Sequence, residues 1–483
     1  LVAAPPSSIG KFGGDTDNWI WPRHTGDFSM FRVYASKDNR PAAYSPQNVP
    51  YRPKKHFSIS TKGVKEGDFT MIYGFPGNTQ EYILSDAVAY IAERSDPAKI
   101  AVRTGRLDII TKAQESDPAL RIHYAAKHAS IANAWKKWQG EALGIDRRGT
   151  VAAKFDYETQ FGLWSVGRPE YAGVVMGLRA EYDRIMDAYF AYEITRETLS
   201  TLPAAYTPEE RAEECFARRK FAEQALWRHA FREYGRCPKV YRTPSYAEGM
   251  ARYKSPEAYA DALFEAVWEG SDSVAMQPAV RLREETKRML DHISWMLGTK
   301  SLRNLNSKIL NELYTTYIKG LREWDRERAF YPDANLTLRV AYGSVAGYEY
   351  ADGEYHKPQT TLDGIIAKDN PEIYDYDIPQ SLRDLYASKN YGRWGTVIDG
   401  RRTVPVCFLA TNHTTGGNSG SPVLNAGGEL IGINFDRTWR STMSDIAFDP
   451  AICRNIAVDI RYVLFVVDRV GGAGYLLKEM TLK

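Results

Sequence analysis

A serine framed by glycines is the feature of this sequence with the clearest capacity for chemistry. Ser419 stands in the string Gly-Asn-Ser-Gly-Ser-Pro, which runs from Gly417 to Pro422. Glycines allow a tight turn whose backbone angles a Cβ atom would forbid. In such a turn the amides of Gly417 and Ser419 converge where the oxyanion of an acyl transfer would form. An ordinary hairpin is the alternative, but the longer string between two apolar runs favours Ser419 as a nucleophile, with Ser421 the weaker candidate.

A serine nucleophile requires a general base and an acidic group that orients the base. Where the order along the chain is histidine, aspartate, serine, the acid lies well before Ser419. Residues 12–28 offer Asp15, Asp17 and Asp27. Asp15 and Asp17 are in a glycine-containing stretch typical of turns. Asp27 comes directly before an alternating, strand-like run, and we predict that it is the acid.

The general base has no candidate among the histidines of this sequence. Only His24 precedes Asp27, and two residues so close on one loop cannot form the long-range arrangement that the chemistry needs. His413 is expected to stabilise the serine turn, and His128 and His292 fall in helical stripes. The histidines are His24, His56, His123, His128, His229, His292, His356 and His413. We expect the catalytic histidine to lie upstream, and this chain to be an N-terminally truncated fragment that is inactive alone.

Size and composition exclude several classes of function. A chain of 483 residues is expected to form two or three domains. The 63 basic and 60 acidic residues nearly cancel, so no overall field favours nucleic acid or an acidic membrane. No apolar run is long enough to span a bilayer. No nucleotide motif or Cys/His metal cluster is visible, and we expect no cofactor and no metal.

The pattern of apolar residues changes twice along the chain. Residues 1–85 and 331–483 contain short, strand-like runs, whereas residues 86–330 are helical. One apolar stripe at helical spacing, interpreted as core, consists of Tyr124, His128, Ile131, Trp135 and Trp138. The strand-like runs are residues 28–34, 68–73, 336–340, 404–410, 430–434 and 455–460. This order predicts an α+β protein in which a large helical domain is inserted between two β-rich segments.

Five long stretches of the sequence resemble one known family. The chain resembles the bacterial dipeptidyl peptidases 7 and 11, which are serine exopeptidases. The matching stretches are Gly13 to Phe28, Ser130 to Trp135, Thr411 to Pro422, Asn434 to Trp439, and Cys453 to Tyr462. The resemblance implies a chymotrypsin-like double β-barrel with a helical insertion. Residues 1–85 would be the remainder of the first barrel, 86–330 a helical cap over the cleft, and 331–483 the second barrel.

The resemblance also implies roles for individual residues. Ser419 would be the nucleophile and Asp27 the triad acid. Asn18, Asn133 and Asp436 would hold the ammonium of the substrate, with Trp19 packed over that end. The helical pattern independently places Asn133 off the apolar stripe, beside small residues that permit close approach.

Arg437 is expected to determine specificity. In this family the position carries arginine in one branch and glycine in the branch that accepts apolar residues. Because a guanidinium pairs with a carboxylate through two hydrogen bonds, we expect Asp or Glu as the second residue of the substrate. The alternatives are a dipeptidyl peptidase with apolar preference, a glutamyl endopeptidase, and a non-catalytic peptide-binding module. The resemblance further suggests a homodimer in the periplasm, acting on peptides.

Overall fold

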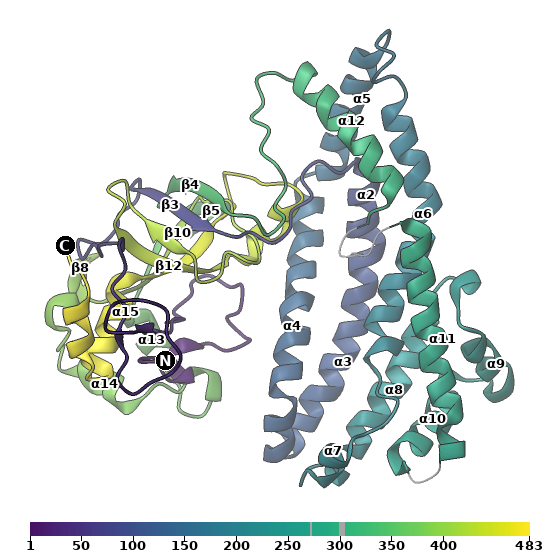
Figure 1. The fold of residues 1–483 in the computed structure, drawn as a ribbon, viewed down its shortest axis with the longest axis horizontal. Coiled ribbons are helices and arrows are strands. Elements are labelled where there is room, and N and C mark those ends of the chain that lie inside the picture. Colours follow the sequence, from purple (N-terminus) through teal and green to yellow (C-terminus); the bar gives the residue numbers. More distant parts are fainter. Residues whose placement is uncertain (271–272, 299–304) are drawn as a thin grey trace. The chain divides into compact units, whose positions relative to one another are not determined.

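The computed structural model describes residues 1–270, 273–298 and 305–483. The chain forms two compact units. The first unit combines Leu1–Glu81 with Asp333–Lys483, and the second comprises Tyr82–Pro332. Strands from both ends of the sequence therefore build one unit, and the helical segment builds the other (Figure 1).

The first unit is organised around an antiparallel seven-stranded sheet. Its order is β4 (Arg339–Ser344), β3 (Phe69–Gly74), β11 (Pro422–Leu424), β12 (Leu430–Arg437), β13 (Asn455–Asp459), β10 (Pro405–Ala410) and β7 (Gln359–Thr361). β3 comes from the N-terminal segment and lies between β4 and β11. An isolated bridge between Val345 and Ala410 joins the end of β4 to the end of β10, so the strands from β4 to β10 close on themselves.

Apolar sequence explains which strands occupy the middle of this unit. Every residue of β10 and β13 is buried, as expected of strands covered on both faces. The helix α15 (Ile460–Phe465) follows β13 directly and is also entirely buried. The strands predicted at 68–73, 404–410, 430–434 and 455–460 are confirmed, and the run 336–340 forms a strand that starts later, at Arg339.

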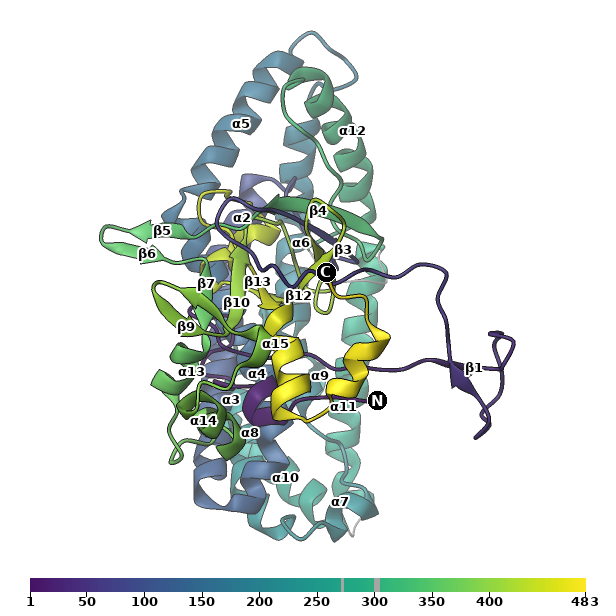
Figure 2. The ribbon, with the colours of Figure 1, turned by 90° about the vertical axis from the view of Figure 1, so that its left-hand side faces the viewer.

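The strand predicted at residues 28–34 is wrong over most of its length. Only Tyr34–Ala35 (β1) pairs, with Val49–Pro50 (β2), and Met30 makes a single bridge to Ala3. Phe31 and Val33 are 72% and 67% exposed. Alternation predicts a strand only where a neighbouring strand takes up the hydrogen bonds, and among the described residues the run 28–33 makes ladder-like contacts only at Met30, with Val2 and Ala3, and at Val33, with Tyr51. Figure 2 shows this segment extending away from the sheet.

Short elements complete the first unit. They are α1 (Ser7–Gly10), β5 (Tyr348–Ala351), β6 (Glu354–His356), α13 (Leu362–Lys368), α14 (Gln380–Ala387), β8 (Thr396–Ile398) and β9 (Arg401–Thr403). α13 and α14 lie with α15 at one end of the sheet (Figure 1).

The second unit is helical. Its helices are α2 (Ser85–Tyr90), α3 (Asp96–Ser116), α4 (Pro118–Arg147), α5 (Thr150–Ser165), α6 (Val174–Glu197), α7 (Pro208–Ala212), α8 (Lys220–Tyr234), α9 (Pro244–Tyr253), α10 (Pro256–Glu269), α11 (Ser273–Leu297) and α12 (Lys308–Trp324). Asp117 ends α3 and caps α4 by accepting a hydrogen bond from the amide of Ala119. Tyr124 and Ile131 of the predicted stripe are fully buried between helices.

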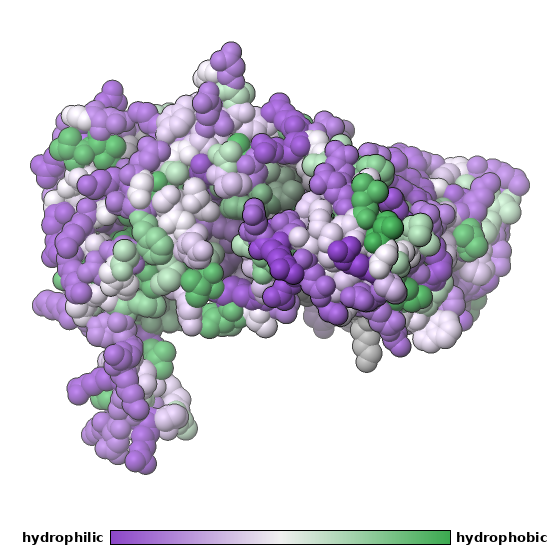
Figure 3. Space-filling view, turned by 90° about the horizontal axis from the view of Figure 1, so that it is seen from above, coloured by the Kyte–Doolittle hydropathy of each residue, from purple (hydrophilic) through white to green (hydrophobic). Residues whose placement is uncertain are grey.

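Polar and apolar side chains are both exposed at the surface. Figure 3 shows a face on which hydrophilic residues predominate and hydrophobic residues form separate patches. Among the described helices, none has the length and apolar character needed to cross a membrane. All four cysteines are buried and carry free thiols.

Candidate active site

Ser419 lies at the surface of the first unit, on the turn that connects the region after β10 to β11. Gly417 and Gly420 have φ angles of 108° and 80°, which are conformations that residues with a Cβ rarely adopt. A Cβ on Gly417 would also stand 2.3 Å from the carbonyl oxygen of Phe75. Glycine at 417 is therefore required both by the turn and by the neighbouring chain.

Buried amide groups hold this turn in place. The side chain of Asn418 is buried and accepts a hydrogen bond from the amide of Thr415 at 3.1 Å. The side chain of Asn434, on β12, donates to the carbonyl of Asn418 at 3.1 Å. On the other side, the amide of Gly77 donates to the carbonyl of Gly416 at 2.6 Å. The serine is thus carried by a rigid turn, as a nucleophile requires.

The donors and acceptors around Ser419 suit acyl transfer. The amides of Gly417 and Ser419 donate no hydrogen bond to any described residue, so both are available to an oxyanion. The Ser419 hydroxyl donates to the carbonyl of Phe435 at 3.3 Å. Phe435 sits where the register of β12 against β13 shifts, between Asn434 and Asp436. A bulge of this kind removes a residue from the ladder and is common beside active sites.

Asp27, the predicted acid, is exposed and has no hydrogen bond or ion pair with any described residue. Its pKa is raised because the surrounding protein displaces part of its hydration; the charge of Asp436 adds to this effect and that of Arg23 opposes it. Asp27 is therefore close enough to Arg23 and Asp436 for their charges to change its pKa. Its carboxylate oxygens are available to accept a hydrogen bond.

No histidine forms a hydrogen bond with Ser419 within the described residues. His24 is buried against Gly364 of α13, and burial, reinforced by Lys368, lowers its pKa to about 3. His413 lies under the serine turn, where a ring nitrogen donates to the carbonyl of Ser444 at 3.1 Å. It also lies 3.6 Å from the carboxylate of Glu81. His24 is thus packed against α13 and His413 is bound to Ser444, and neither forms a hydrogen bond with Ser419.

Asp436 follows the bulge, and its side chain is 10% exposed. It forms an ion pair with Arg23, whose Nη1 lies 2.9 Å from Oδ2. The amides of Trp19 and Arg437 also donate to its carboxylate, at 3.3 and 2.8 Å. Burial raises the pKa of Asp436, and Arg23 opposes that rise. The carboxylate predicted to receive a substrate ammonium therefore already has one internal cation.

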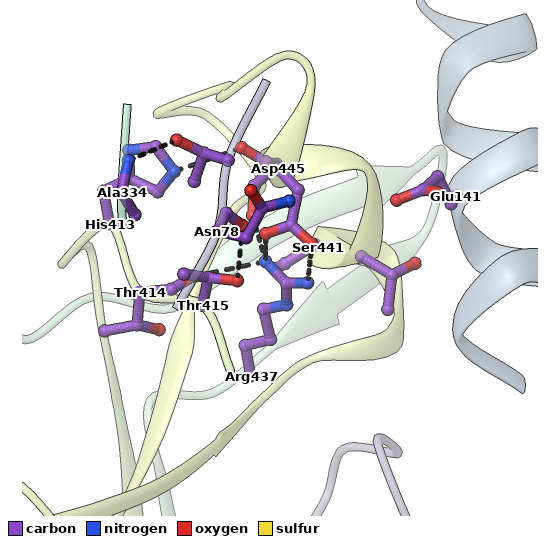
Figure 4. A network of polar contacts seen from close by, with 12 residues as sticks. Asn78, Glu141, Ala334, His413, Thr414, Thr415, Arg437, Ser441 and Asp445 are labelled. Carbon is purple, nitrogen blue, oxygen red and sulfur yellow. Dashed lines mark hydrogen bonds and ion pairs between the residues drawn. The ribbon is translucent and has the colours of Figure 1, made fainter. Parts of the chain in front are cut away.

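Arg437 is also buried and paired. Its Nη1 and Nη2 donate to the two carboxylate oxygens of Asp445, at 2.6 and 2.8 Å, and Nη1 also reaches the Ser444 hydroxyl at 2.8 Å and the carbonyl of Thr414 at 3.2 Å. Figure 4 shows the guanidinium facing Asp445, which ends the 3-10 turn Trp439–Asp445. The predicted specificity residue is thus fixed by a two-pronged ion pair.

The remaining predicted residues fall in both units. Asn18 and Trp19 are half-buried in the first unit, and Trp19 has a positive φ of 68°. Its backbone is held at both ends, because the Trp19 amide faces Asp436 and its carbonyl accepts from the amide of Trp439. Asn133 is exposed on α4 of the second unit.

Sequence reasoning missed Arg23 and Asp445, the partners of the two charged residues. Arg23 lies 413 positions from Asp436, and no local pattern predicts a contact of that separation. Asp445 is closer, eight positions after Arg437, but an aspartate in a loop after a strand has no distinctive signal.

A family model, curated relatives and solved structures all relate this chain to peptidases. The family model described as Peptidase S46 matches residues 1–220 and 209–482. An "Asp/Glu-specific dipeptidyl-peptidase" of Capnocytophaga gingivalis is 42% identical over 528 residues, covering 100% of this chain and 73% of that protein. A "Dipeptidyl-peptidase 7" of Phocaeicola vulgatus is 35% identical over 523 residues, covering 100% and 72%. The crystal structure of Porphyromonas endodontalis DPP11 in complex with substrate is similar at a TM-score of 0.83 and 34% identity, covering 100% and 74%.

Proposed function

Because this chain belongs to the Peptidase S46 family, we propose that it is a serine exopeptidase that releases dipeptides from the free N-termini of peptides and prefers Asp or Glu as the second residue. The observation that carries the proposal is the order of groups along β12. Phe435, whose carbonyl accepts the Ser419 hydroxyl, is followed immediately by Asp436 and Arg437. An anion for an ammonium and a cation for a carboxylate therefore stand next to the nucleophile.

Ser419 is the proposed nucleophile, with the amides of Gly417 and Ser419 as the oxyanion hole and Asp27 as the acid of the triad. The available carboxylate oxygens of Asp27 support this assignment, since the acid of a triad must accept a hydrogen bond from the base. The base is proposed to be a histidine outside residues 1–483, because none of the eight in the chain hydrogen-bonds to Ser419.

The substrate ammonium is proposed to bind Asp436 together with Asn18 and Asn133, with Trp19 against the N-terminal residue. A cation taken out of water needs an anion and additional acceptors. The fixed backbone of Trp19, hydrogen-bonded toward Asp436 and Trp439, supports a role in shaping that end of the site. The helical unit, which carries Asn133, is proposed to cap the cleft and so to limit the substrate to a dipeptide.

Arg437 is proposed to recognise the carboxylate of the second residue. Its place two residues after Phe435 and its fixed guanidinium support this role. The related proteins of Capnocytophaga gingivalis and Flavobacterium psychrophilum are both named Asp/Glu-specific. A structure of the Porphyromonas endodontalis enzyme holds the dipeptide Arg-Glu.

The finer fold and the setting of the protein are proposed on the family resemblance. The sheet closed by the Val345–Ala410 bridge supports the second barrel of a chymotrypsin-like pair, and residues 1–85 are proposed to belong to the first. We also propose a homodimer in the periplasm. Analytical ultracentrifugation and cell fractionation test these two statements.

The function is tested with fluorogenic dipeptide conjugates ending in Glu, Asp, Gln or Leu, each with a free and with an acetylated N-terminus. The complete product of the gene is the enzyme, and its Ser419→Ala variant is the control. We expect rapid cleavage of the free Glu and Asp conjugates, and none by the variant. Equal cleavage of acetylated conjugates would indicate an endopeptidase instead, and no cleavage of any conjugate would favour a peptide-binding module.

A further inference from the structure

The ion pair between Arg437 and Asp445 presents a difficulty for the recognition of an acidic substrate. The side chain of Arg437 is 5% exposed and that of Asp445 is 15% exposed. Both terminal nitrogens of the guanidinium donate to Asp445. This is the geometry in which a guanidinium binds a carboxylate most strongly. Asp445 therefore occupies the edge of Arg437 that is best suited to a substrate carboxylate.

The two charged residues of β12 are each paired with an opposite charge before substrate arrives. Arg23 neutralises Asp436, and Asp445 neutralises Arg437. A substrate with an acidic second residue brings one ammonium and one carboxylate. Its carboxylate meets a cation whose charge is compensated, in surroundings that exclude most water. A second carboxylate beside one guanidinium is repelled by the first.

Asp445 is not the only group that holds Arg437 in position. Nη1 is also held by the Ser444 hydroxyl and by the carbonyl of Thr414. The backbone of Asp445 is fixed separately, since its carbonyl accepts from the amide of Gln80 at 2.6 Å. When the carboxylate of Asp445 gives up a hydrogen bond to the guanidinium, Arg437 still has two neutral acceptors, the Ser444 hydroxyl and the Thr414 carbonyl.

We propose that Asp445 is a specificity-determining residue that competes with the substrate carboxylate for Arg437. This inference rests on the proposed function. Binding of an acidic second residue requires Asp445 to release at least one of its hydrogen bonds to Arg437, whereas a neutral second residue leaves the pair intact. The pair thereby weakens the preference for acidic residues and keeps neutral ones acceptable.

The test replaces Asp445 with asparagine, which has the same shape and retains one acceptor but carries no charge. In the complete gene product, we expect Asp445→Asn to raise kcat/KM for Glu-containing conjugates about tenfold or more, the range of a close charge interaction in a shielded site. Cleavage of the Gln conjugate should change by less than about twofold. In the 483-residue chain, calorimetry should show tighter binding of the dipeptide Arg-Glu by a similar factor and unchanged binding of Arg-Gln.

A matched control separates competition from a general effect of losing an ion pair. Arg383 and Asp369 form a two-pronged pair at 2.7 and 2.8 Å, with the carboxylate also 15% exposed, on elements that carry none of the site residues. Asp369→Asn should leave the ratio of Glu to Gln cleavage unchanged. A lower or unaltered ratio in Asp445→Asn would overturn the inference and make Asp445 a structural partner. A wild type that cleaves neither conjugate would instead refute the proposed function.

Discussion

Asp436 and Arg437 are neighbours on β12, yet each is neutralised by a different part of the chain. Arg23, near the N-terminus, lies 2.9 Å from Asp436, and Asp445, in the turn after the strand, lies 2.6 Å from Arg437. Successive side chains of a strand point to opposite faces, which separates the two pairs. Two adjacent residues of β12 therefore carry opposite charges that are held by two different parts of the chain.

The Arg23–Asp436 pair leads to a prediction about the substrate amine. In the complete gene product, Asp436→Asn should reduce kcat/KM for conjugates with a free N-terminus by about 2–4 kcal/mol, as for a broken buried charge pair. The substitution removes the anion and leaves Arg23 facing the ammonium. Steady-state kinetics on the Glu conjugate provides the measurement.

The acetylated conjugate serves as the control for Asp436. It has no ammonium, so its slow cleavage by the wild type should be little affected by the substitution. If both conjugates lose activity equally, Asp436 maintains the structure of β12 and does not bind the amine.

Arg437 should determine the preference for the second residue. Arg437→Gly should lower cleavage after Glu and Asp by more than about tenfold, because a desolvated carboxylate loses its partner. Cleavage after Leu should persist. The activity of Arg437→Lys on Glu and Asp conjugates should be intermediate, since lysine keeps the positive charge but cannot donate two parallel hydrogen bonds to one carboxylate. The readout is the ratio of kcat/KM for Glu and Leu conjugates.

Arg437→Gly also removes the guanidinium partner of Asp445, so loss of stability has to be separated from loss of recognition. The double variant Arg437→Gly with Asp445→Asn removes both charges. It should show the same apolar preference as the single variant, with a higher melting temperature. A Glu to Leu ratio that stays at the wild-type value in both variants would assign Arg437 a purely structural role.

Ser419 should be unreactive in the 483-residue chain. The hydroxyl donates to a backbone carbonyl, which cannot take its proton, and no histidine in the described part of the chain is bonded to it. We expect a fluorophosphonate probe to label the complete gene product at Ser419 and to leave the 483-residue chain unlabelled, as judged by intact mass. Stoichiometric labelling of the 483-residue chain would reveal a base that the arrangement around Ser419 does not suggest.

The sequence was most informative where local pattern determines structure. The glycine frame of Ser419 predicted a tight turn, and the φ angles of Gly417 and Gly420 agree with it. Apolar runs predicted β10, β12 and β13 because buried central strands need no partner information beyond their own composition.

Prediction from the sequence failed where strand pairing or an ion pair depends on residues outside the local sequence. Residues 28–34 alternate as a strand does, but only Tyr34 of this run is in a strand, the two-residue β1, because the described residues pair with the rest at Met30 and Val33 alone. The partners of Asp436 and Arg437 were likewise invisible, since Arg23 reaches Asp436 across most of the chain. Ion pairs formed by folding have no signature in the spacing of either partner.

His24 should make the first unit sensitive to acid. Its pKa is about 3 in the folded chain, because burial, and to a lesser extent Lys368, disfavours the imidazolium. In the unfolded chain it returns to about 6.5. Between these pH values the unfolded state binds the proton more tightly, so stability is full above about pH 6.5 and declines as the pH falls toward 3. The decline in the free energy of unfolding that is attributable to His24 is on the order of 4 kcal/mol.

Urea denaturation of the 483-residue chain at pH 7, 5.5 and 4 measures this decline. His24→Gln, which cannot gain a proton, should flatten this dependence, whereas His292→Gln, at an exposed position of α11, should not. Parallel curves for the two variants would mean that other groups cause the acid sensitivity of the first unit.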